Sequence, residues 1–227
     1  MRAPLSIVIP TLDAEQELPA TLHFLMEGIS AGLVCELLIS DGGSKDATLT
    51  IADAVGAVVV SGSAGRGGQL RRGAEAAIGE WLLFLHADTH LGAGWSDIVA
   101  EHIRQSDRVA CFRLRFRAHG AAPRLVAGWA NFRSWMGLPY GDQGLLIRRS
   151  VYDRAGGYPD IPIMEDVALA RALRGRIEIL DVEANTSAER YLQDGWLRRG
   201  AKNLWTLAGY FWGVPPDNLA KRYLGRD

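Results

Sequence analysis

Residues 5–26 read LSIVIPTLDAEQELPATLHFLM, and this stretch decides the fold class. Its first six residues form a short apolar run that ends at Pro10, which is typical of a buried strand. Leucines at positions 18, 22 and 25 then give residues 15–26 the spacing of a helix with one buried face. A buried strand followed directly by an amphipathic helix is the repeating unit of a parallel sheet.

The same order of strand and helix recurs along the first half of the chain. Apolar runs over residues 35–39, 57–60 and 81–85 predict three further strands. Asp46 is expected to cap a helix that runs to about Ala54, and the glycine-rich loop 62–68 leads into a helix through Ala77. We therefore predict an α/β fold with a mainly parallel sheet flanked by helices.

The second half of the sequence is less regular. Residues 109–118 alternate cysteine and arginine with phenylalanine and leucine, which predicts a strand with one wet face at a sheet edge or lining a cleft. The remaining predicted elements are helices over 123–135, 165–174 and 192–211 and a strand over 144–147. Because no linker-like stretch interrupts the chain, we expect one domain over residues 1–227, with two fused halves that meet at about residue 105.

Composition narrows the class of protein. A net charge of -1 gives no global basic field, so nucleic acid is not an expected partner. The two cysteines, Cys35 and Cys111, lie in apolar runs and are interpreted as small buried hydrophobes. The first residues show no signal-peptide pattern and no apolar run reaches about 20 residues. These features predict a cytoplasmic protein and leave open a peripheral contact with the inner face of the membrane.

Charged residues follow the predicted strands at the edge where such sheets bind ligands. Asp41 can accept a hydrogen bond from a nucleobase, Arg66 before a helix suits a diphosphate, and Asp88 suits Mg²⁺ or Mn²⁺. Each also has a structural interpretation, as a turn residue, a residue of a flexible surface loop or a helix cap.

Four segments in this order carry a family resemblance: SIVIPTLDAEQELPATL, LLISDGGSKDAT, GRGGQLRRGAEAAIGEWLLFLHADT and MEDVALARAL. Together with a late GVPP, they resemble the family 2 glycosyltransferases with the GT-A fold, in particular a short, soluble bacterial subgroup with the same HADT and MED motifs. The resemblance covers residues 5–174. It implies that residues 1–105 bind a nucleotide sugar and that residues 106–227 bind the acceptor and end in a C-terminal helix.

For the donor, the resemblance implies a UDP- or GDP-sugar and a divalent metal, Mg²⁺ or Mn²⁺, at Asp88. The chain departs from the family pattern, because His86 stands where the first aspartate of Asp-x-Asp would be, and His86 is left open as a second metal ligand. Leu12 also replaces a frequent tyrosine, and Asp13 a frequent asparagine. The implied nucleotide-binding residues are Pro10, Thr11, Asp13, Glu15, Asp41, Gly42, Arg66, Ala87 and Asp88.

For catalysis, the resemblance implies an inverting, hexosyltransferase-like enzyme in which Asp166 is the general base and Glu165 supports it. Asp142 and Gln143 are expected to contact acceptor hydroxyls, and Arg190 to reach the diphosphate. The acceptor stays unidentified, and a lipid-linked acceptor is left open. The aromatic tail over 196–212 is interpreted first as a core-packing or dimerising helix, and alternatively as an interfacial membrane helix.

Two other functions fit parts of the sequence. A non-catalytic sensor or scaffold that binds a nucleotide sugar would explain His86 in place of a carboxylate, whereas Asp166 speaks against it. A nucleotidyltransferase would need a glycine-rich basic loop after the first strand, and residues 11–15 contain neither glycine nor a basic residue.

Overall fold

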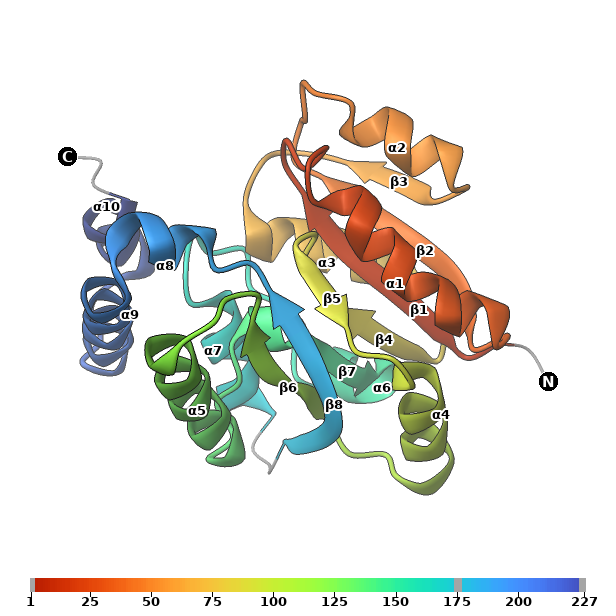
Figure 1. The fold of residues 1–227 in the computed structure, drawn as a ribbon. Coiled ribbons are helices and arrows are strands. Elements are labelled where there is room, and N and C mark those ends of the chain that lie inside the picture. The colour runs from red at the N-terminus through yellow and green to blue at the C-terminus, as the bar shows by residue number, and fades with distance from the viewer. Residues whose placement is uncertain (1–2, 174–176, 225–227) are drawn as a thin grey trace.

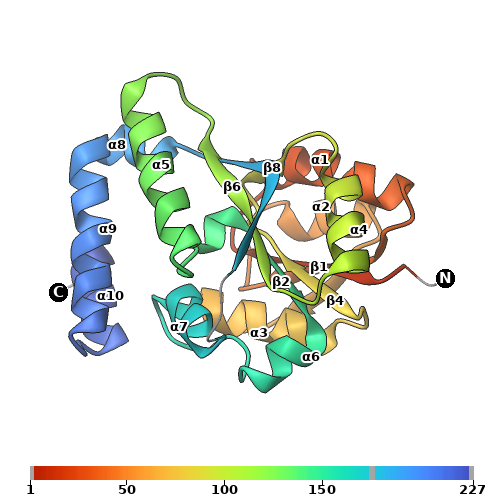
Figure 2. The same cartoon turned by 90° about the horizontal axis from the view of Figure 1, so that it is seen from below.

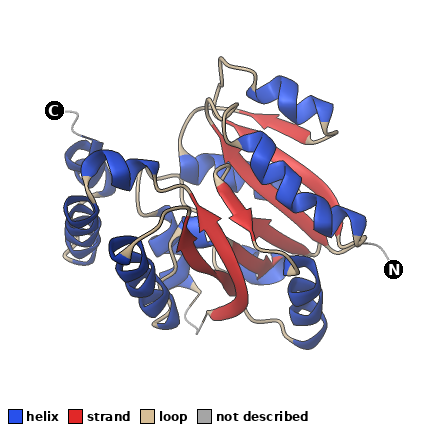
Figure 3. Cartoon of the chain, viewed as in Figure 1, coloured by secondary structure: helices blue, strands red, loops and turns tan. Residues whose placement is uncertain are grey.

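The computed structural model describes residues 3–173 and 177–224, which form a central sheet with helices on both faces (Figure 1). The sheet has the order β3-β2-β1-β4-β7-β6-β8-β5. Its strands are β1 (Leu5–Thr11), β2 (Val34–Asp41), β3 (Val58–Ser61), β4 (Trp81–Phe84), β5 (Thr89–Leu91), β6 (Ala110–Phe116), β7 (Leu145–Arg148) and β8 (Glu178–Thr186). The strand order shows that this one sheet takes strands from both halves of the chain, and Figure 3 shows these strands in red.

The helices connect these strands. They are α1 (Leu18–Ser30), α2 (Thr48–Ala54), α3 (Arg66–Ala76), α4 (Trp95–Gln105), α5 (Ala121–Trp135), α6 (Arg149–Arg154), α7 (Glu165–Ala172), α8 (Glu189–Asp194), α9 (Trp196–Phe211) and α10 (Pro216–Leu224), with a short 3-10 helix, η1 (Gly141–Gln143). Seen from below, α5 and α9 lie side by side at the end of the molecule opposite α1 and α2 (Figure 2).

The predicted parallel sheet is present in the first half. β1 pairs with β2 and β4 in parallel, and β2 pairs with β3 in parallel, so their carboxyl ends meet at one edge. The second half adds antiparallel pairs of β7 with β4 and β6, and of β5 with β8. The α/β class is therefore confirmed, and the strands after β4 make the sheet mixed.

Two hydrophobic cores lie on the two faces of the sheet. On one face Leu22 of α1 and Trp95 of α4 pack against Ile7 and other strand residues. On the other face Leu70 of α3 and Leu169 of α7 pack with Val8 and its neighbours. Because successive strand residues point to opposite faces, the apolar run of β1 supplies both cores, which is why it is uninterrupted.

Several predicted boundaries differ from the observed ones. The helix expected from residue 15 begins at Leu18, and the helix expected to be capped by Asp46 has Ala47 at its N-cap. The expected long helix over 192–211 is broken at Gly195, whose φ of 84° lies in the left-handed region that favours glycine. The last residue of the helix expected over 165–174, Arg174, lies outside the described residues.

The prediction of an edge position for residues 109–118 is wrong, because β6 lies inside the sheet between β7 and β8. The predicted wet face is present, because Arg113 and Arg115 alternate with buried residues and are 54% and 61% exposed. Both arginines also meet acidic partners on β8. Arg113 pairs with Asp181 at 2.8 Å and Arg115 with Glu183 at 2.9 Å. These opposite charges on adjacent strands explain how a strand with alternating arginines occupies an interior position.

The start of α3 is a place where only a glycine fits. A Cβ added to Gly67 would clash with the backbone oxygen of Pro159 and would lie 3.3 Å from Ile161 N. We expect Gly67→Ala to lower the free energy of unfolding by about 1–3 kcal/mol, because backbone atoms must shift.

Denaturant unfolding with Gly128→Ala as the matched control checks this expectation. At Gly128 in α5 a Cβ would meet no described atom beyond its own helix within 4 Å, so this variant should be neutral or about 0.4–1 kcal/mol more stable. Equal stabilities of the two variants would contradict the steric argument.

Candidate active site

The carboxyl ends of β1 and β2 form the first wall of the site. Thr11 and Asp41 are register partners at the ends of these strands, and Thr11 Oγ1 donates to Asp41 Oδ1 at 3.1 Å. Asp41 also accepts from the backbone N–H groups of Gly43 and Ser44, at 2.7 and 2.9 Å, and from Ser44 Oγ. These hydrogen bonds hold the pKa of Asp41 below its usual value although burial opposes them.

The carboxylate of Asp41 already has hydrogen-bond partners in this structure. Its side chain is only 1% exposed, and both oxygens already accept hydrogen bonds within the strand ends and the following loop. A nucleobase N–H would therefore compete with existing donors. Asp41 builds the loop of Gly42 and Gly43, and the predicted direct contact with a base is not preformed in this structure.

Two loops at this edge are joined by hydrogen bonds from backbone N–H groups to side-chain carboxylates. Asp13 Oδ1 accepts from Lys45 N at 2.8 Å, and Glu15 Oε2 accepts from Ala47 N at 2.8 Å. In return Glu15 N donates to Asp46 Oδ2 at 2.9 Å. Asp13 has a φ of 49°, a left-handed conformation that aspartate tolerates better than most residues. The predicted nucleotide residues Asp13 and Glu15 thus shape the wall of the site.

Gln69 is a site-forming residue that sequence reasoning missed. Its side chain is buried in the first turns of α3, and its Nε2 donates to the carbonyl oxygens of Thr11 at 2.7 Å and Ser40 at 2.9 Å. Its Oε1 accepts from Gly65 N at 3.2 Å. One amide therefore fixes the ends of β1 and β2 relative to the loop before Arg66. The signal in the sequence was a polar residue directly after the glycines at 67 and 68.

Arg66 joins the two halves of the site. It is the first residue of α3, and its Nε lies 2.7 Å from Oε1 of Glu165, which begins α7. The Arg66 side chain is 43% exposed while that of Glu165 is 3% exposed. Burial raises the pKa of Glu165, and the charge of Arg66 opposes that rise. The residue predicted for the diphosphate is thus in contact with one predicted for catalysis.

His86 and Asp88 follow β4 and lie at the centre of the site. Burial, with the charges of Arg66 and Arg190, lowers the pKa of His86 to about 3, so its imidazole is neutral at pH 7. Burial also raises the pKa of Asp88, although the charge of Arg190 acts in the opposite direction. In both residues burial disfavours the charged form, which lowers the pKa of the histidine and raises the pKa of the carboxyl group.

Arg190 is the second residue of α8 and is exposed, and its charge lowers the pKa of His86 and opposes the rise in the pKa of Asp88. Arg117, which sequence reasoning did not select for the site, also holds this loop. It donates from Nη2 to the Asp88 carbonyl oxygen at 3.3 Å and to Glu17 Oε2 at 2.6 Å. The alternating arginines of β6 were its only signal in the sequence. Ala87, a predicted nucleotide contact, accepts from Thr21 Oγ1 at 2.6 Å through its carbonyl oxygen.

Gly141 links Asp166 to His86. Gly141 N donates to Asp166 Oδ2 at 2.9 Å, and a Cβ added to Gly141 would lie 2.7 Å from His86 Nε2. The charge of Asp166, after the larger effect of burial, contributes to raising the pKa of Asp142 to about 6, and Asp88 contributes next. Gly141 therefore places Asp166 beside the loop of His86, although the two residues lie far apart in the sequence.

The side chain of Gln143, predicted to contact an acceptor hydroxyl, is turned into the protein in this structure. Its side chain is 0% exposed, and its amide is fully engaged: Oε1 accepts from Ser134 Oγ at 2.5 Å, and Nε2 donates to Phe112 O at 3.1 Å and Asn131 Oδ1 at 3.2 Å. No polar atom of Gln143 is left for an acceptor hydroxyl. It positions η1, and through η1 it positions Asp142.

The donor atoms of this site fit a divalent cation. Among the described residues, His86 Nε2 and Asp142 Oδ1 are buried atoms with no hydrogen-bond partner. A neutral imidazole and carboxylates can both coordinate Mn²⁺, and carboxylates suit Mg²⁺. In the described part of the chain no group of three such side chains forms a complete ion site. The predicted arrangement, one carboxylate with the donor phosphates, does not require one.

Asp142 gives a prediction on pH and stability. Below pH 3.8 both folded and unfolded chains carry this proton; between 3.8 and about 6 the unfolded chain releases it first, so the folded state loses stability as pH rises. We expect Asp142→Asn to raise the free energy of unfolding at pH 7 by about 1–3 kcal/mol, with the gain developing between pH 4 and 6.

Urea unfolding of both proteins at several pH values, with a chelator present, measures this difference. The exposed Asp153 of α6 supplies the control, since Asp153→Asn should track the wild type at every pH. If Asp142→Asn gains the same free energy of unfolding at pH 4 and pH 7, then burial of the charged Asp142 carboxylate does not destabilise the folded state.

Comparison with known proteins identifies the family. A family model described as glycosyl transferase family 2 matches residues 6–156, which includes β1 to β4, His86, Asp88 and Asp142. The chain is a family 2 glycosyltransferase. An uncharacterized glycosyltransferase of Mycobacterium tuberculosis is 30% identical over 192 residues, covering 78% of this glycosyltransferase and 83% of the relative.

A second relative shares a shorter stretch. A PGL/p-HBAD biosynthesis glycosyltransferase of Mycobacterium tuberculosis is 37% identical over 99 residues, which is 40% of this glycosyltransferase. The match spans only 38% of that relative's length.

Solved structures confirm the GT-A fold of the glycosyltransferase. Glucosyl-3-phosphoglycerate synthase from Mycobacterium tuberculosis, in complex with Mn²⁺ and UDP-glucose, has a TM-score of 0.64 at 21% identity, over 93% of this chain and 80% of that one. S. aureus TarS 1-349 in complex with UDP-GlcNAc has a TM-score of 0.60 at 16% identity, over 81% and 58%. At these identities the likeness establishes the shared fold.

Proposed function

We propose that this glycosyltransferase moves a sugar from a nucleotide-diphosphate donor to an acceptor hydroxyl with inversion at the anomeric carbon. The observation that carries the proposal is the position of Gly141: its N–H donates to Asp166 Oδ2 at 2.9 Å, and a Cβ added to it would lie 2.7 Å from His86 Nε2, so the proposed base lies beside the loop that carries Asp88. A UDP-sugar donor is the first choice, because fold neighbours are complexes with UDP-glucose and UDP-GlcNAc.

On the donor side, Asp88 would hold a divalent cation, with His86 Nε2 and Asp142 as further donor atoms. A bound Mg²⁺ or Mn²⁺ supplies neutralisation of the charge that grows on the leaving nucleoside diphosphate. Arg66 would bind the diphosphate at the start of α3, where backbone N–H groups also favour anions. Arg190 would add a second positive charge from α8.

On the acceptor side, Asp166 would act as the general base. Its Oδ2 is held by Gly141 N and its Oδ1 by Val167 N at 2.7 Å, so the carboxylate has a fixed orientation. The acceptor oxygen attacks the anomeric carbon, its proton passes to Asp166, and the bond from that carbon to the diphosphate oxygen breaks. Nucleoside diphosphate then leaves with the electron pair of that bond.

A screen of nucleotide sugars tests the proposal. We expect one UDP- or GDP-sugar to raise the melting temperature in the presence of Mn²⁺ or Mg²⁺, and nucleoside diphosphate to be released slowly when water replaces the acceptor. Failure of every nucleotide sugar to shift the melting temperature would overturn the proposed donor class.

One observation keeps a second function in consideration. His86, neutral and buried, stands where the family places an acidic residue, which would suit a protein that binds a nucleotide sugar without turning it over. Binding of a nucleotide sugar without any release of nucleoside diphosphate, with metal and candidate acceptors present, would favour this sensor or scaffold role over transfer.

A further inference from the structure

Two neighbouring helices outside the active site carry apolar side chains on their exposed faces. On α5 these are Leu125, Trp129, Phe132, Trp135 and the adjoining Met136; on α9 they are Leu197, Leu204, Trp205 and the adjoining Trp212. On α5 the spacing is three or four residues, which places the set on one face. On α9, Leu197 and Leu204 are seven residues apart, as are Trp205 and Trp212, and seven residues are close to two full turns. Both views place α5 and α9 side by side, at the end away from α1 and α2 (Figures 1 and 2).

The exposure of these side chains is large. Leu197 is 89% exposed, Trp212 75% and Trp205 67%. Trp129, Phe132 and Trp135 form a row of ring contacts along α5, with centroids 6.0 and 5.9 Å apart. Single exposed apolar residues are ordinary, but several large ones on two neighbouring helices mark an interaction surface.

The charges around this surface select the partner. Neither α5 nor α9, both described throughout, contains an acidic residue, and together they carry Arg124, Arg133, Arg198, Arg199 and Lys202. Of these, Arg133 is buried, whereas Arg124 and Arg198 are exposed. The nearby acidic Asp194 is engaged by Arg199 at 2.8 Å. The surface is therefore apolar and cationic.

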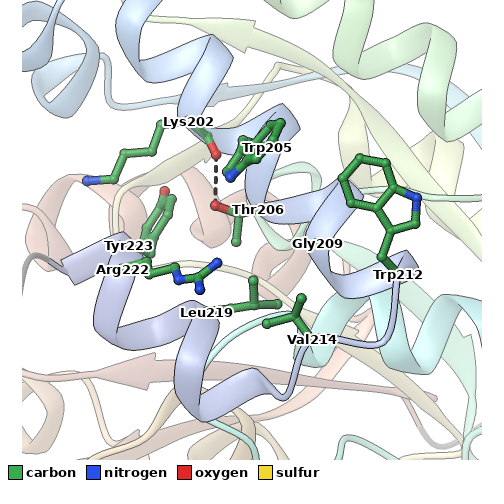
Figure 4. Close-up of a pocket in the computed structure, with 9 residues that line it drawn as sticks. All are labelled: Lys202, Trp205, Thr206, Gly209, Trp212, Val214, Leu219, Arg222 and Tyr223. Atoms are coloured by element: carbon green, nitrogen blue, oxygen red, sulfur yellow. Dashed lines mark hydrogen bonds between the residues drawn. The ribbon is translucent and has the colours of Figure 1, made fainter.

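The groove between α9 and α10 repeats this combination. Figure 4 shows Trp205 and Trp212 at the groove, together with the basic side chains of Lys202 and Arg222. Thr206 Oγ1 is turned back onto Lys202 O at 2.7 Å, so the hydroxyl is satisfied inside the helix. Tryptophan beside lysine and arginine is the composition that binds the boundary between anionic headgroups and acyl chains.

We propose that the exposed faces of α5 and α9 dock this protein on the surface of a bilayer that contains anionic lipids. The tryptophan rings enter the headgroup boundary, and the basic side chains bind the phosphate groups. Among the described residues no helix is long and apolar enough to span a membrane. The proposed contact lies in the plane of the surface and stands independently of the transfer reaction.

Sedimentation with lipid vesicles tests this proposal. We expect the full chain to bind vesicles of phosphatidylcholine with phosphatidylglycerol, and to bind pure phosphatidylcholine much less. The double variant Trp205→Ser with Trp212→Ser should bind the anionic vesicles about tenfold more weakly or worse. Arg198→Gln with Lys202→Gln should lose most of the preference for anionic lipid and its sensitivity to salt.

Ile78→Ser is the matched control, because Ile78 is also exposed but lies in the turn between α3 and β4. It should bind vesicles like the wild type. A wild type that stays in solution with both vesicles, or tryptophan variants that bind equally well, would overturn the proposal. So would a dimer in light scattering that the tryptophan variants convert to monomers without any vesicle binding, since a second copy would then cover this surface.

Nucleoside diphosphate release, measured without vesicles on the same samples, separates this proposal from the transferase proposal. Trp205→Ser with Trp212→Ser should keep the wild-type release rate, because both side chains lie outside the site. Vesicle binding without donor turnover would support the membrane proposal and not the transferase proposal. Donor turnover without vesicle binding would overturn the membrane proposal and leave the transferase proposal standing.

Discussion

Asp166→Asn is expected to lower the rate of sugar transfer by about 10²–10⁴-fold while leaving donor binding unchanged. Asparagine has nearly the same shape and can still accept the hydrogen bond from Gly141 N, so the position of η1 should persist. What it loses is the ability to take the proton from the acceptor hydroxyl. The measurement is the transfer rate with saturating donor, together with the donor-induced shift in melting temperature.

The exposed Asp153→Asn is the control for this experiment, because it changes the same charge away from the site. A variant at Asp166 that transfers sugar at more than about a tenth of the wild-type rate would remove Asp166 from the role of base. Loss of the donor-induced shift together with activity would instead assign Asp166 to the donor pocket.

Asp88→Asn is expected to remove the dependence of donor binding on metal and to reduce transfer by at least about 100-fold. A cation that neutralises the leaving group contributes several kcal/mol, and about 1.4 kcal/mol corresponds to tenfold in rate. Because burial raises the pKa of Asp88, a proton competes with the cation for this carboxylate, and binding of the cation should weaken as pH falls. Calorimetry with Mn²⁺ and donor at two pH values measures both effects.

The exposed Asp53→Asn on α2 controls for the change of charge. If Asp88→Asn keeps the full metal-dependent melting shift, then His86 and Asp142 hold the ion without it. If neither the wild type nor the variant responds to metal, then the proposed metal dependence is wrong, although Asp166 could still act as the base.

The first half of the fold was predictable because its strands are buried on both faces. The apolar run of β1 and the turn glycines after β2 are local signals, and the structure places strands at both. β8 was not predicted, because its acidic residues hide the pattern: Asp181 and Glu183 are matched by arginines on β6, which are distant in the sequence. Pairing across strands is information that a single segment does not carry.

In the candidate site too, some features follow from local sequence signals and others depend on packing. Asp88 and Asp166 stand at element ends that the motifs mark, so sequence alone selects both as candidates, and the structure places Asp166 close to His86 of the same loop as Asp88. Gln143 lies in the same loop as Asp142, yet its amide is turned inward onto Asn131. Sequence places both residues on one turn, and only packing decides which of them faces the site.

The hydrogen bonds of Asp13 and Glu15 determine which side chains in the joined loops can change without loss of structure. Both carboxylates bind backbone N–H groups, at positions 45 and 47, so the bond is indifferent to the side chains there. Lys45 and Ala47 can therefore be exchanged without loosening the wall that their own amides help to build. The side chains that this wall displays at positions 45 and 47 can thus change while the two loops stay joined.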